Sequence, residues 1–146
     1  MSLDSIKHYP VMLDEILGFI SDNKTIVDCT FGGGGYSLGI LKKFKKSHVI
    51  GLDRDKNILK HALNLKNNYI DRFNFHNIKF SQIHQLEHFN NSDFFIFDLG
   101  LSNFQLKNMK RGFSFESNST LDMTMGLNSF NAHDLIKKIS EKDLKN

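Results

Sequence analysis

The 146-residue chain has few of the features that mark secreted or membrane proteins. Its single cysteine, Cys29, excludes a disulfide within the chain and makes a reducing compartment the simplest expectation. No apolar run approaches the roughly 18 residues that a membrane-spanning helix needs, and the first ten residues lack the basic start and apolar stretch of a signal peptide. We therefore expect a soluble, unsecreted protein, with the cytoplasm as the default location.

A strong excess of one charge sign is also missing. The chain has 19 Lys and Arg residues against 16 Asp and Glu residues, which gives a formal net charge of +3. Because phosphate binding depends on clustered cations, this balance permits an RNA partner without indicating one. With 40% hydrophobic residues, the chain fits one compact domain with an ordinary core.

Two consecutive strand–helix units follow a first helix. Apolar residues from Met12 to Ile20 recur every three or four positions behind Pro10, which predicts an amphipathic helix. The run Thr25–Cys29 predicts a strand, and four glycines separate it from a stretch that resumes helical spacing. The same pattern repeats from the strand His48–Asp53 onwards. Two such units in succession indicate a parallel sheet.

Two further strands and one helix are expected in the rest of the chain. Phe73–Phe80 is aromatic-rich and predicts a third strand. Phe94–Leu99 is a continuous apolar run that ends in an acid, a pattern typical of a parallel strand with both faces covered. From Gly100 the pattern becomes loop-like, until Ala132–Leu144 offers one last amphipathic helix.

Acidic residues end three of the predicted strands: Asp28, Asp53 and Asp98. Open parallel sheets bind ligands beyond the carboxyl ends of their strands, and a glycine loop before a helix lets a ligand approach backbone N–H groups. Asp53 follows Gly35 by 53 − 35 = 18 residues, close to the offset of about 20 at which such an acid binds ribose hydroxyls. A nucleotide-like ligand is the natural expectation.

The glycine spacing favours one cofactor among three interpretations. The stretch from Asp28 to Ser37 has no glycine or alanine at the third position of the dinucleotide fingerprint. It matches instead the D-x-G-x-G-x-G loop of class I S-adenosylmethionine (AdoMet) methyltransferases, with Thr30 in the first glycine position. A dinucleotide site and a purely structural glycine turn are the alternatives.

Six segments, in order, resemble the small-subunit ribosomal RNA (16S rRNA) cytosine-N4 methyltransferases, the RsmH/MraW family. They are His8 to Glu15 (HYPVMLDE), Asp28 to Ser37, Gly51 to Asp55 (GLDRD), Phe97 to Ser102 with Gln105 and Leu106, Arg111 to Phe115 (RGFSF), and Leu121 to Met123. The resemblance extends from residue 8 to about residue 132 and so covers nearly the whole chain.

The resemblance implies a set of cofactor-binding residues: Gly34, Gly35, Tyr36, Asp53, Phe80, Asp98 and Gln105. Asp98 is also the candidate catalytic residue, because an acceptor there would orient the amine that receives the methyl group; the backbone carbonyls of Leu99 to Ser102 are the alternative acceptors. Tyr36 departs from the family's usual histidine, so only a backbone contact carries over at that position. Asn103 and Phe104 replace a Ser-Pro pair, and Thr124 replaces an arginine.

The expected fold is α/β, a partial Rossmann-like class I methyltransferase sheet of strand order 3-2-1-4 with helices on both faces. Residues 1–127 would form the AdoMet-binding core, and residues 128–146 would begin an inserted helical subdomain that is truncated. Strand four would then be an open edge with an apolar run. Small-subunit rRNA is the expected partner, together with a separate C-terminal half or a second copy over that edge. The alternative functions are a truncated or split half that binds AdoMet but needs a second chain or is inactive, and an NAD-dependent oxidoreductase.

Several side chains outside that set have two interpretations each. Phe104 and Phe113 are candidates for stacking on an unpaired base, or packing anchors. Arg111 would contact a phosphate or pair with Asp122. The lysines around Phe44 are typical of a solvated helix face, with an RNA-backbone contact as the alternative; they are Lys42, Lys43, Lys45 and Lys46. His84 and His88 have no evident further ligand, so no metal site is expected.

Overall fold

The computed structural model describes residues 9–87, 89–127 and 130–145 and divides the chain into two compact units, Met1–Gly100 and Leu101–Asn146. The domain boundary predicted at residues 127 and 128 falls beside residues 128–129, which lie outside the described residues. That division therefore stays a prediction, and each unit is described by itself.

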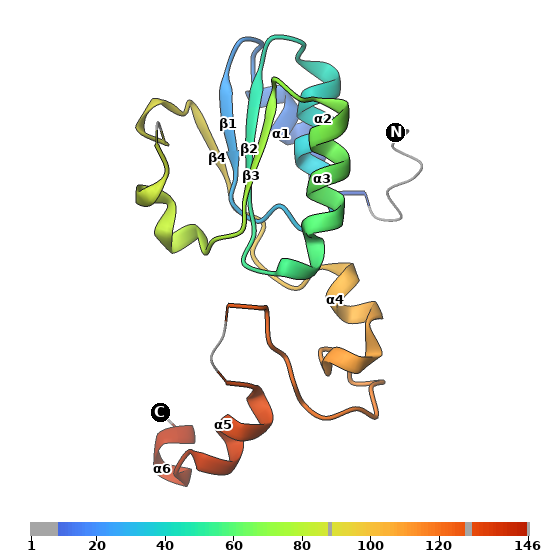
Figure 1. Ribbon diagram of the computed structural model, residues 1–146, viewed down its shortest axis with the longest axis vertical. Helices are drawn as coiled ribbons and strands as arrows, with labels where there is room; N and C mark the ends of the chain where they lie inside the picture. Colours follow the sequence, from blue (N-terminus) through green and yellow to red (C-terminus); the bar gives the residue numbers. More distant parts are fainter. Residues whose placement is uncertain (1–8, 88, 128–129, 146) are drawn as a thin grey trace. The chain divides into compact units, whose positions relative to one another are not determined.

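The first unit contains a four-stranded parallel sheet (Figure 1). Its strands are β1 (Thr25–Asp28), β2 (His48–Leu52), β3 (Phe73–His76) and β4 (Phe94–Ile96). The strand order is β3-β2-β1-β4, and every neighbouring pair is parallel. The predicted fold class and strand order are confirmed.

Three α-helices cover one face of this sheet (Figure 1): α1 (Leu13–Phe19), α2 (Gly35–Lys43) and α3 (Leu59–Asn68). Apolar residues of these helices pack with Ile26, Val49 and Phe73 in one buried cluster. The helical spacing predicted from the sequence therefore places its apolar stripe on the core, where burial supplies most of the stabilisation.

The second face carries 3-10 turns rather than α-helices. A smaller buried cluster of Val27, Cys29 and Leu52 lies there, with Ile83 packed against it. Ile83 belongs to η3 (Phe80–Gln85), which follows β3, and the shorter turn η4 (Phe89–Asn91) follows η3. The turn η2 (Lys56–Ile58) precedes α3 instead and places Ile58 in the first cluster. Helices thus occur on both faces, but this face has the thinner cover.

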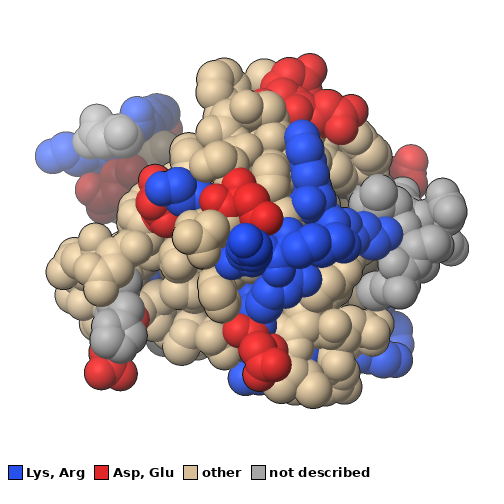
Figure 2. Space-filling model, turned by 90° about the horizontal axis from the view of Figure 1, so that it is seen from above, with Lys and Arg blue, Asp and Glu red and all other residues tan. Residues whose placement is uncertain are grey.

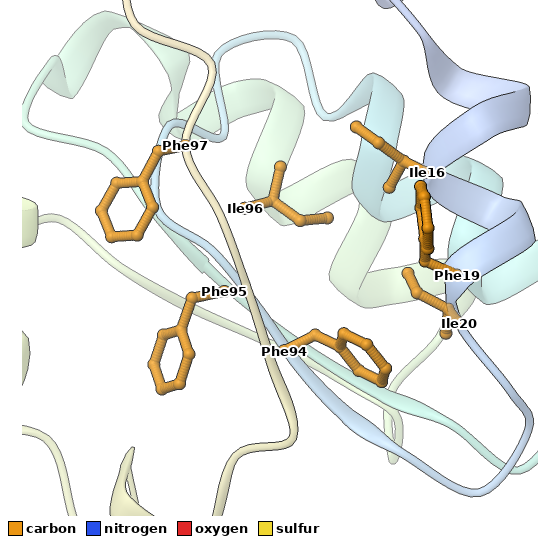
Figure 3. A pocket seen from close by; sticks show the side chains of 7 residues that line it. All are labelled: Ile16, Phe19, Ile20, Phe94, Phe95, Ile96 and Phe97. Atoms are coloured by element: carbon orange, nitrogen blue, oxygen red, sulfur yellow. The ribbon is translucent and has the colours of Figure 1, made fainter.

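Strand β4 is the edge of the sheet, and it has no second strand neighbour among the described residues. Figure 3 shows Phe94 and Ile96 directed toward α1, whereas Phe95 and Phe97 point to the other side. A groove of about 260 Å³ runs along this edge, lined by Ile16, Phe19, Ile20, Phe94, Phe95, Ile96 and Phe97. Phe95 is 43% exposed and Phe97 is 51% exposed, so the expectation that both faces of this strand are covered is wrong, and the expected open edge is present.

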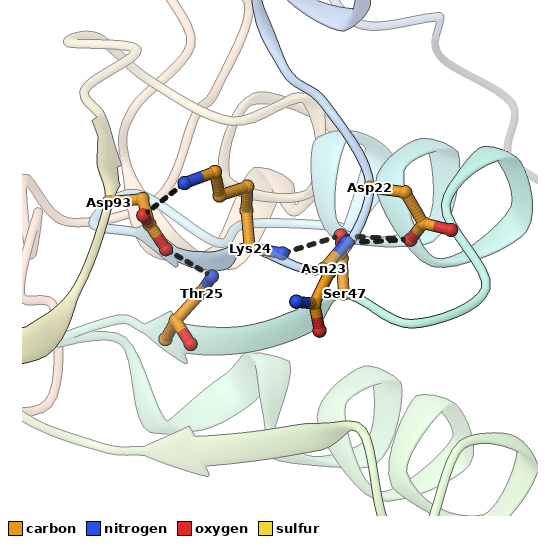
Figure 4. Close-up of polar contacts among 6 residues, drawn as sticks. All are labelled: Asp22, Asn23, Lys24, Thr25, Ser47 and Asp93. Atoms are coloured by element: carbon orange, nitrogen blue, oxygen red, sulfur yellow. Dashed lines mark hydrogen bonds and ion pairs between the residues drawn. The ribbon is translucent and has the colours of Figure 1, made fainter.

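A polar cluster fixes the other end of the sheet, where the strands begin (Figure 4). Asp93 accepts hydrogen bonds from the Thr25 N–H and the Lys24 ammonium, each at 2.8 Å. Ser47 accepts from the Lys24 N–H at 3.1 Å. These donors hold the pKa of Asp93 below its ordinary value. The cluster sets the starting register of β1, β2 and β4.

The second unit consists of short helices: α4 (Asn103–Lys107), η5 (Met109–Arg111), α5 (Ala132–Lys138) and α6 (Glu141–Leu144). The loop predicted after Gly100 is therefore partly helical. The prediction of a single last helix is also wrong, because the helix breaks before Ser140. The Ser140 hydroxyl accepts a hydrogen bond from the Asp143 N–H at 3.1 Å and so caps α6. Among the described residues no helix is long and apolar enough to span a membrane.

Candidate functional site

The glycine loop joins the end of β1 to the start of α2, and packing restricts it. Gly34 precedes the helix with a φ of 77°, and a Cβ there would lie 2.7 Å from Cζ of Phe31. A Cβ on Gly35 would lie 2.3 Å from Cγ of Pro10. Both positions therefore exclude a side chain through contacts within the protein. The loop thus brings the start of α2 to the carboxyl end of the sheet, beside Asp28.

Asp28 lies at the end of β1 and is fully buried. One of its oxygens, Oδ2, accepts a hydrogen bond from the Ser37 hydroxyl at 2.7 Å, whereas Oδ1 has no hydrogen-bond partner among the described residues. Burial raises the pKa of this carboxyl to about 6, and the Ser37 hydroxyl works in the opposite direction. The loop thus closes around an incompletely paired acid.

Asp53, just after β2, connects that strand to the glycine loop. Its Oδ2 accepts from the Gly32 N–H and its Oδ1 accepts from the Asp55 N–H, each at 2.8 Å. Burial raises the pKa of Asp53, and the two backbone donors partly offset that effect. A carboxylate offers about four lone-pair positions, so this one can accept further bonds from a ligand.

Asp98, after β4, is the exposed acid of the three. Its backbone N–H donates to the Thr30 hydroxyl at 2.8 Å, which holds the chain against the end of β1. The phenol oxygen of Tyr36 lies 3.5 Å from Oδ2 of Asp98, at the outer limit of a hydrogen bond. The structure therefore brings the glycine loop, Asp53 and Asp98 to the same end of the sheet, where the strands end.

Tyr36 is buried in the first turn of α2, and its hydroxyl donates to the carbonyl of Val11. Burial, followed by the charge of Asp98, raises the pKa of this phenol to about 12. The family resemblance carried over only a backbone contact at this position. The Tyr36 side chain nevertheless links the segment before α1 to Asp98.

Phe80 and Gln105 complete the predicted set. Phe80 begins η3 in the first unit, is 42% exposed, and meets the ring of Phe97 edge-on at a centroid distance of 5.6 Å. Gln105 belongs to the second unit and is buried. Its side chain accepts from the Ser102 N–H at 2.9 Å, while Ser102 caps α4, so this glutamine forms a capping box.

Arg111 has a structural role within the second unit. Its guanidinium donates to the carbonyl of Thr124 at 2.5 Å and lies over the ring of Phe113 at 5.0 Å from the centroid. Both side chains are buried, so Phe113 serves as a packing anchor. Phe104 is 44% exposed. Of the two predicted base-stacking candidates, only Phe104 presents a large part of its surface.

Sequence reasoning missed three contributors to this edge. Ser37 and Pro10 contact the glycine loop as described, and the Asn77 side chain donates to the carbonyl of Asp53 at 2.7 Å. The signal for Ser37 was its position nine residues after Asp28, which places it in the first turn of α2. For Pro10 and Asn77 the sequence carried no signal, because both contacts are long-range.

Lys and Arg side chains gather at the other end of the sheet, where the strands begin. Figure 2 looks onto that end and shows a band of these side chains across it. The Arg72 guanidinium donates to the carbonyls of Leu41, Phe44 and Ser47 at 3.1, 2.8 and 3.3 Å. The Lys43 ammonium donates to the carbonyl of Leu17 at 3.2 Å. These bonds fasten the ends of α1 and α2.

Among the described residues no three His, Cys, Asp or Glu side chains are placed to hold a metal ion. Of the predicted histidine pair, His84 lies in η3, and His88 lies outside the described residues.

The strand order, the glycine loop and the acids at one edge define a Rossmann-like parallel α/β protein. The chain belongs to the MraW methylase family, whose model matches residues 5–146.

Relatives with the name ribosomal RNA small subunit methyltransferase H are similar over almost the whole chain. The protein of Rickettsia canadensis is 41% identical over 139 residues, which are 94% of this chain and 45% of that protein. The protein of Brachyspira hyodysenteriae is 41% identical over 143 residues, 95% of this chain and 47% of that protein. The chain thus spans about half the length of the curated relatives it matches.

Similarity to solved structures is weaker. The apo form of mycolic acid cyclopropane synthase CmaA1 matches 56% of this chain and 31% of its own, at 22% identity and a TM-score of 0.45. Family membership therefore rests on the sequence.

Proposed function

We propose that this chain is the cofactor-binding part of an AdoMet-dependent methyltransferase that acts on the exocyclic N4 amine of a cytidine in small-subunit ribosomal RNA. One observation carries the proposal: in a member of the MraW methylase family, the glycine loop and the acids Asp28, Asp53 and Asp98 meet at one edge of a parallel sheet. The relatives named ribosomal RNA small subunit methyltransferase H supply the substrate class.

The charges at this edge suit a cationic ligand. AdoMet carries a sulfonium and an ammonium group, and its ribose hydroxyls are donors. A buried oxygen of Asp28 without a partner and the remaining lone pairs of Asp53 are acceptors. A dinucleotide would instead bring a diphosphate close to these carboxyls, and like charges repel. The residues present therefore fit AdoMet better than NAD.

Each predicted residue then has a role that its position allows. The backbone of Gly34, Gly35 and Tyr36 would meet the methionine part, Asp53 would accept from the ribose, and the exposed ring of Phe80 would stack on the adenine. Gln105 is the contribution proposed from the second unit. When bound, AdoMet supplies an electrophilic methyl group.

Asp98 is the proposed catalytic residue. The cytosine amine is a poor nucleophile because its lone pair is conjugated with the ring, so the amine has to be held in line with the methyl carbon at about 3 to 3.5 Å. The exposed carboxylate of Asp98 can accept an N–H of the amine and fix that orientation. The target base must be unpaired, because a duplex hides its reactive edge.

Calorimetric titration with AdoMet and with NAD tests the cofactor. We expect binding of AdoMet in preference to NAD, and the variant Phe80→Ala should weaken AdoMet binding at least fivefold through lost stacking of about 1 kcal/mol or more. Phe19→Ala is the matched control, because Phe19 is 80% exposed and lies on α1. Preferential NAD binding would favour an oxidoreductase and overturn the proposal.

The edge of the sheet gives a second candidate function, that of a chain that needs a partner. Among the described residues, β4 leaves an apolar edge uncovered (Figure 3). Methyl incorporation into naked small-subunit rRNA and into assembled subunits should be measured with this chain alone. AdoMet binding without methyl transfer would assign the chain to this second function.

A further inference from the structure

The segment before α1 is fastened onto the glycine loop by two independent contacts. Pro10 is buried directly against Gly35, since a Cβ on that glycine would fall 2.3 Å from the proline Cγ. The carbonyl of the next residue, Val11, accepts the hydrogen bond of the buried Tyr36 hydroxyl. Both contact residues, Gly35 and Tyr36, belong to the proposed cofactor loop. The segment from Tyr9 to Met12 therefore forms one wall of the same site.

This wall presents apolar side chains to solvent at the cost of backbone strain. Tyr9 is 57% exposed, Val11 is 61% exposed and Met12 is 60% exposed. Met12 adopts the left-handed region with a φ of 57°, which L side chains rarely adopt and which strains the backbone there. The Met12 carbonyl accepts from the Ile16 N–H at 3.0 Å, so the strained residue starts α1 and turns the segment across the loop.

This wall lies beside Asp98, the acid proposed to orient the amine that accepts the methyl group. The Tyr36 hydroxyl that holds Val11 also lies 3.5 Å from Oδ2 of Asp98. A carbonyl on the wall and the carboxylate of Asp98 thus converge on one phenol. A planar base whose amine is oriented by Asp98 would place its ring beside these exposed apolar side chains.

We propose that Val11 and Met12 form the apolar contact surface for the unpaired nucleobase of the RNA substrate. The inference rests on the proposed function and extends it to the acceptor side of the site. An unpaired base removed from its stack needs an apolar surface to replace its lost neighbours, and exposed apolar side chains on a segment fastened to the glycine loop supply one. The ligand class is a single-stranded pyrimidine-containing RNA.

Met12→Gly separates this role from a structural one. Glycine relieves the left-handed strain, so the variant should melt at a higher temperature than the wild type while it loses the apolar contact. Asn23→Gly is the control, because Asn23 also has a positive φ of 61° but lies before β1, at the end of the sheet far from the site. Met12→Leu keeps an apolar side chain and should retain affinity.

The measurement is binding of a fluorescent hexaribonucleotide with one cytidine, in the presence of S-adenosylhomocysteine. We expect Met12→Gly to weaken RNA binding at least fivefold, and Asn23→Gly and Met12→Leu to stay within twofold of the wild type. In protein with ¹³C-labelled methionine methyl groups, RNA should shift the signal that is missing from the Met12→Leu spectrum.

Three results would overturn the inference: unchanged RNA affinity in Met12→Gly, no RNA binding by the wild-type chain, or a loss confined to S-adenosylhomocysteine affinity. The last result would place Met12 against the cofactor instead. Failure of the wild-type chain to bind S-adenosylhomocysteine at all would be a failure of the proposed function and is read separately by calorimetry.

Discussion

The buried carboxyl of Asp28 should make the stability of this protein fall as the pH rises. Burial raises its pKa from 3.8 to about 6 in the folded state. A carboxyl whose folded-state pKa is raised binds its proton more tightly in the folded than in the unfolded chain. Its contribution to stability is therefore complete below about pH 4 and is lost as the pH rises through about 6.

The size of the effect follows from the two pKa values. A difference of about two pKa units corresponds to about 3 kcal/mol over the full titration. Between about pH 4.5 and about pH 7.5, the accessible part is about 2 kcal/mol. This is a large fraction of the stability of a small domain.

The variant Asp28→Asn isolates this group. Asparagine keeps an oxygen that can accept from the Ser37 hydroxyl but does not titrate. Urea denaturation followed by far-ultraviolet circular dichroism gives the free energy of unfolding of both proteins at each pH. The difference between wild type and variant should change by about 2 kcal/mol in favour of the variant from pH 4.5 to pH 7.5. Groups that do not interact with Asp28 titrate alike in both proteins and cancel, whereas Asp53, whose charge raises the pKa of Asp28, is a coupled neighbour.

Parallel pH profiles of the two proteins would refute this reasoning, as would a wild type that gains relative stability with rising pH. Parallel profiles would mean that folding does not raise the pKa of Asp28, and a relative gain with rising pH would mean that its ionised form is stabilised. Both results conflict with the burial of the unpartnered Oδ1.

Three further perturbations have defined outcomes. Gly35→Ala should destabilise the fold by about 1 to 3 kcal/mol and weaken AdoMet binding, because the new Cβ displaces Pro10; equal melting temperatures would contradict the close approach at 2.3 Å. Arg72→Gln should cost about 2 to 3 kcal/mol in urea denaturation through the lost carbonyl contacts, and Arg72→Lys should restore only part; full stability in the lysine variant would refute a role for the guanidinium geometry. Phe95→Lys should reduce self-association in sedimentation velocity, and an unchanged concentration dependence would argue against association over the β4 edge.

Local sequence patterns were enough to predict the sheet. The β-branched run before the glycines and the second strand–helix unit predict a parallel sheet, because apolar periodicity and chain direction depend on nearby residues. The open edge at β4 followed instead from the strand order that the family resemblance implies, because no local pattern indicates it. A continuous apolar run is typical of a strand covered on both faces, and only the strand order shows that Phe95 and Phe97 lie on an edge.

The candidate site was predictable to a similar extent. The strand-end acids and the glycine loop have fixed positions relative to the strands, so the sequence places Asp53 and Asp98 at one edge. What each oxygen does there depends on long-range contacts. The Gly32 N–H bond to Asp53 and the contact of Pro10 with Gly35 join residues 21 and 25 positions apart, and no local pattern encodes them.

The short edge strand has a consequence for local motion. Among the described residues β4 pairs with β1 alone, from Ile26–Phe94 to Asp28–Ile96, with the bond from Thr25 to Asp93 at its start and the bond from Asp98 to Thr30 beyond its end. β2, by contrast, is paired on both sides. Amide hydrogen exchange should therefore be faster in β4 than in β2, and opening of β4 would release Asp98 from Thr30 without unfolding the rest of the sheet.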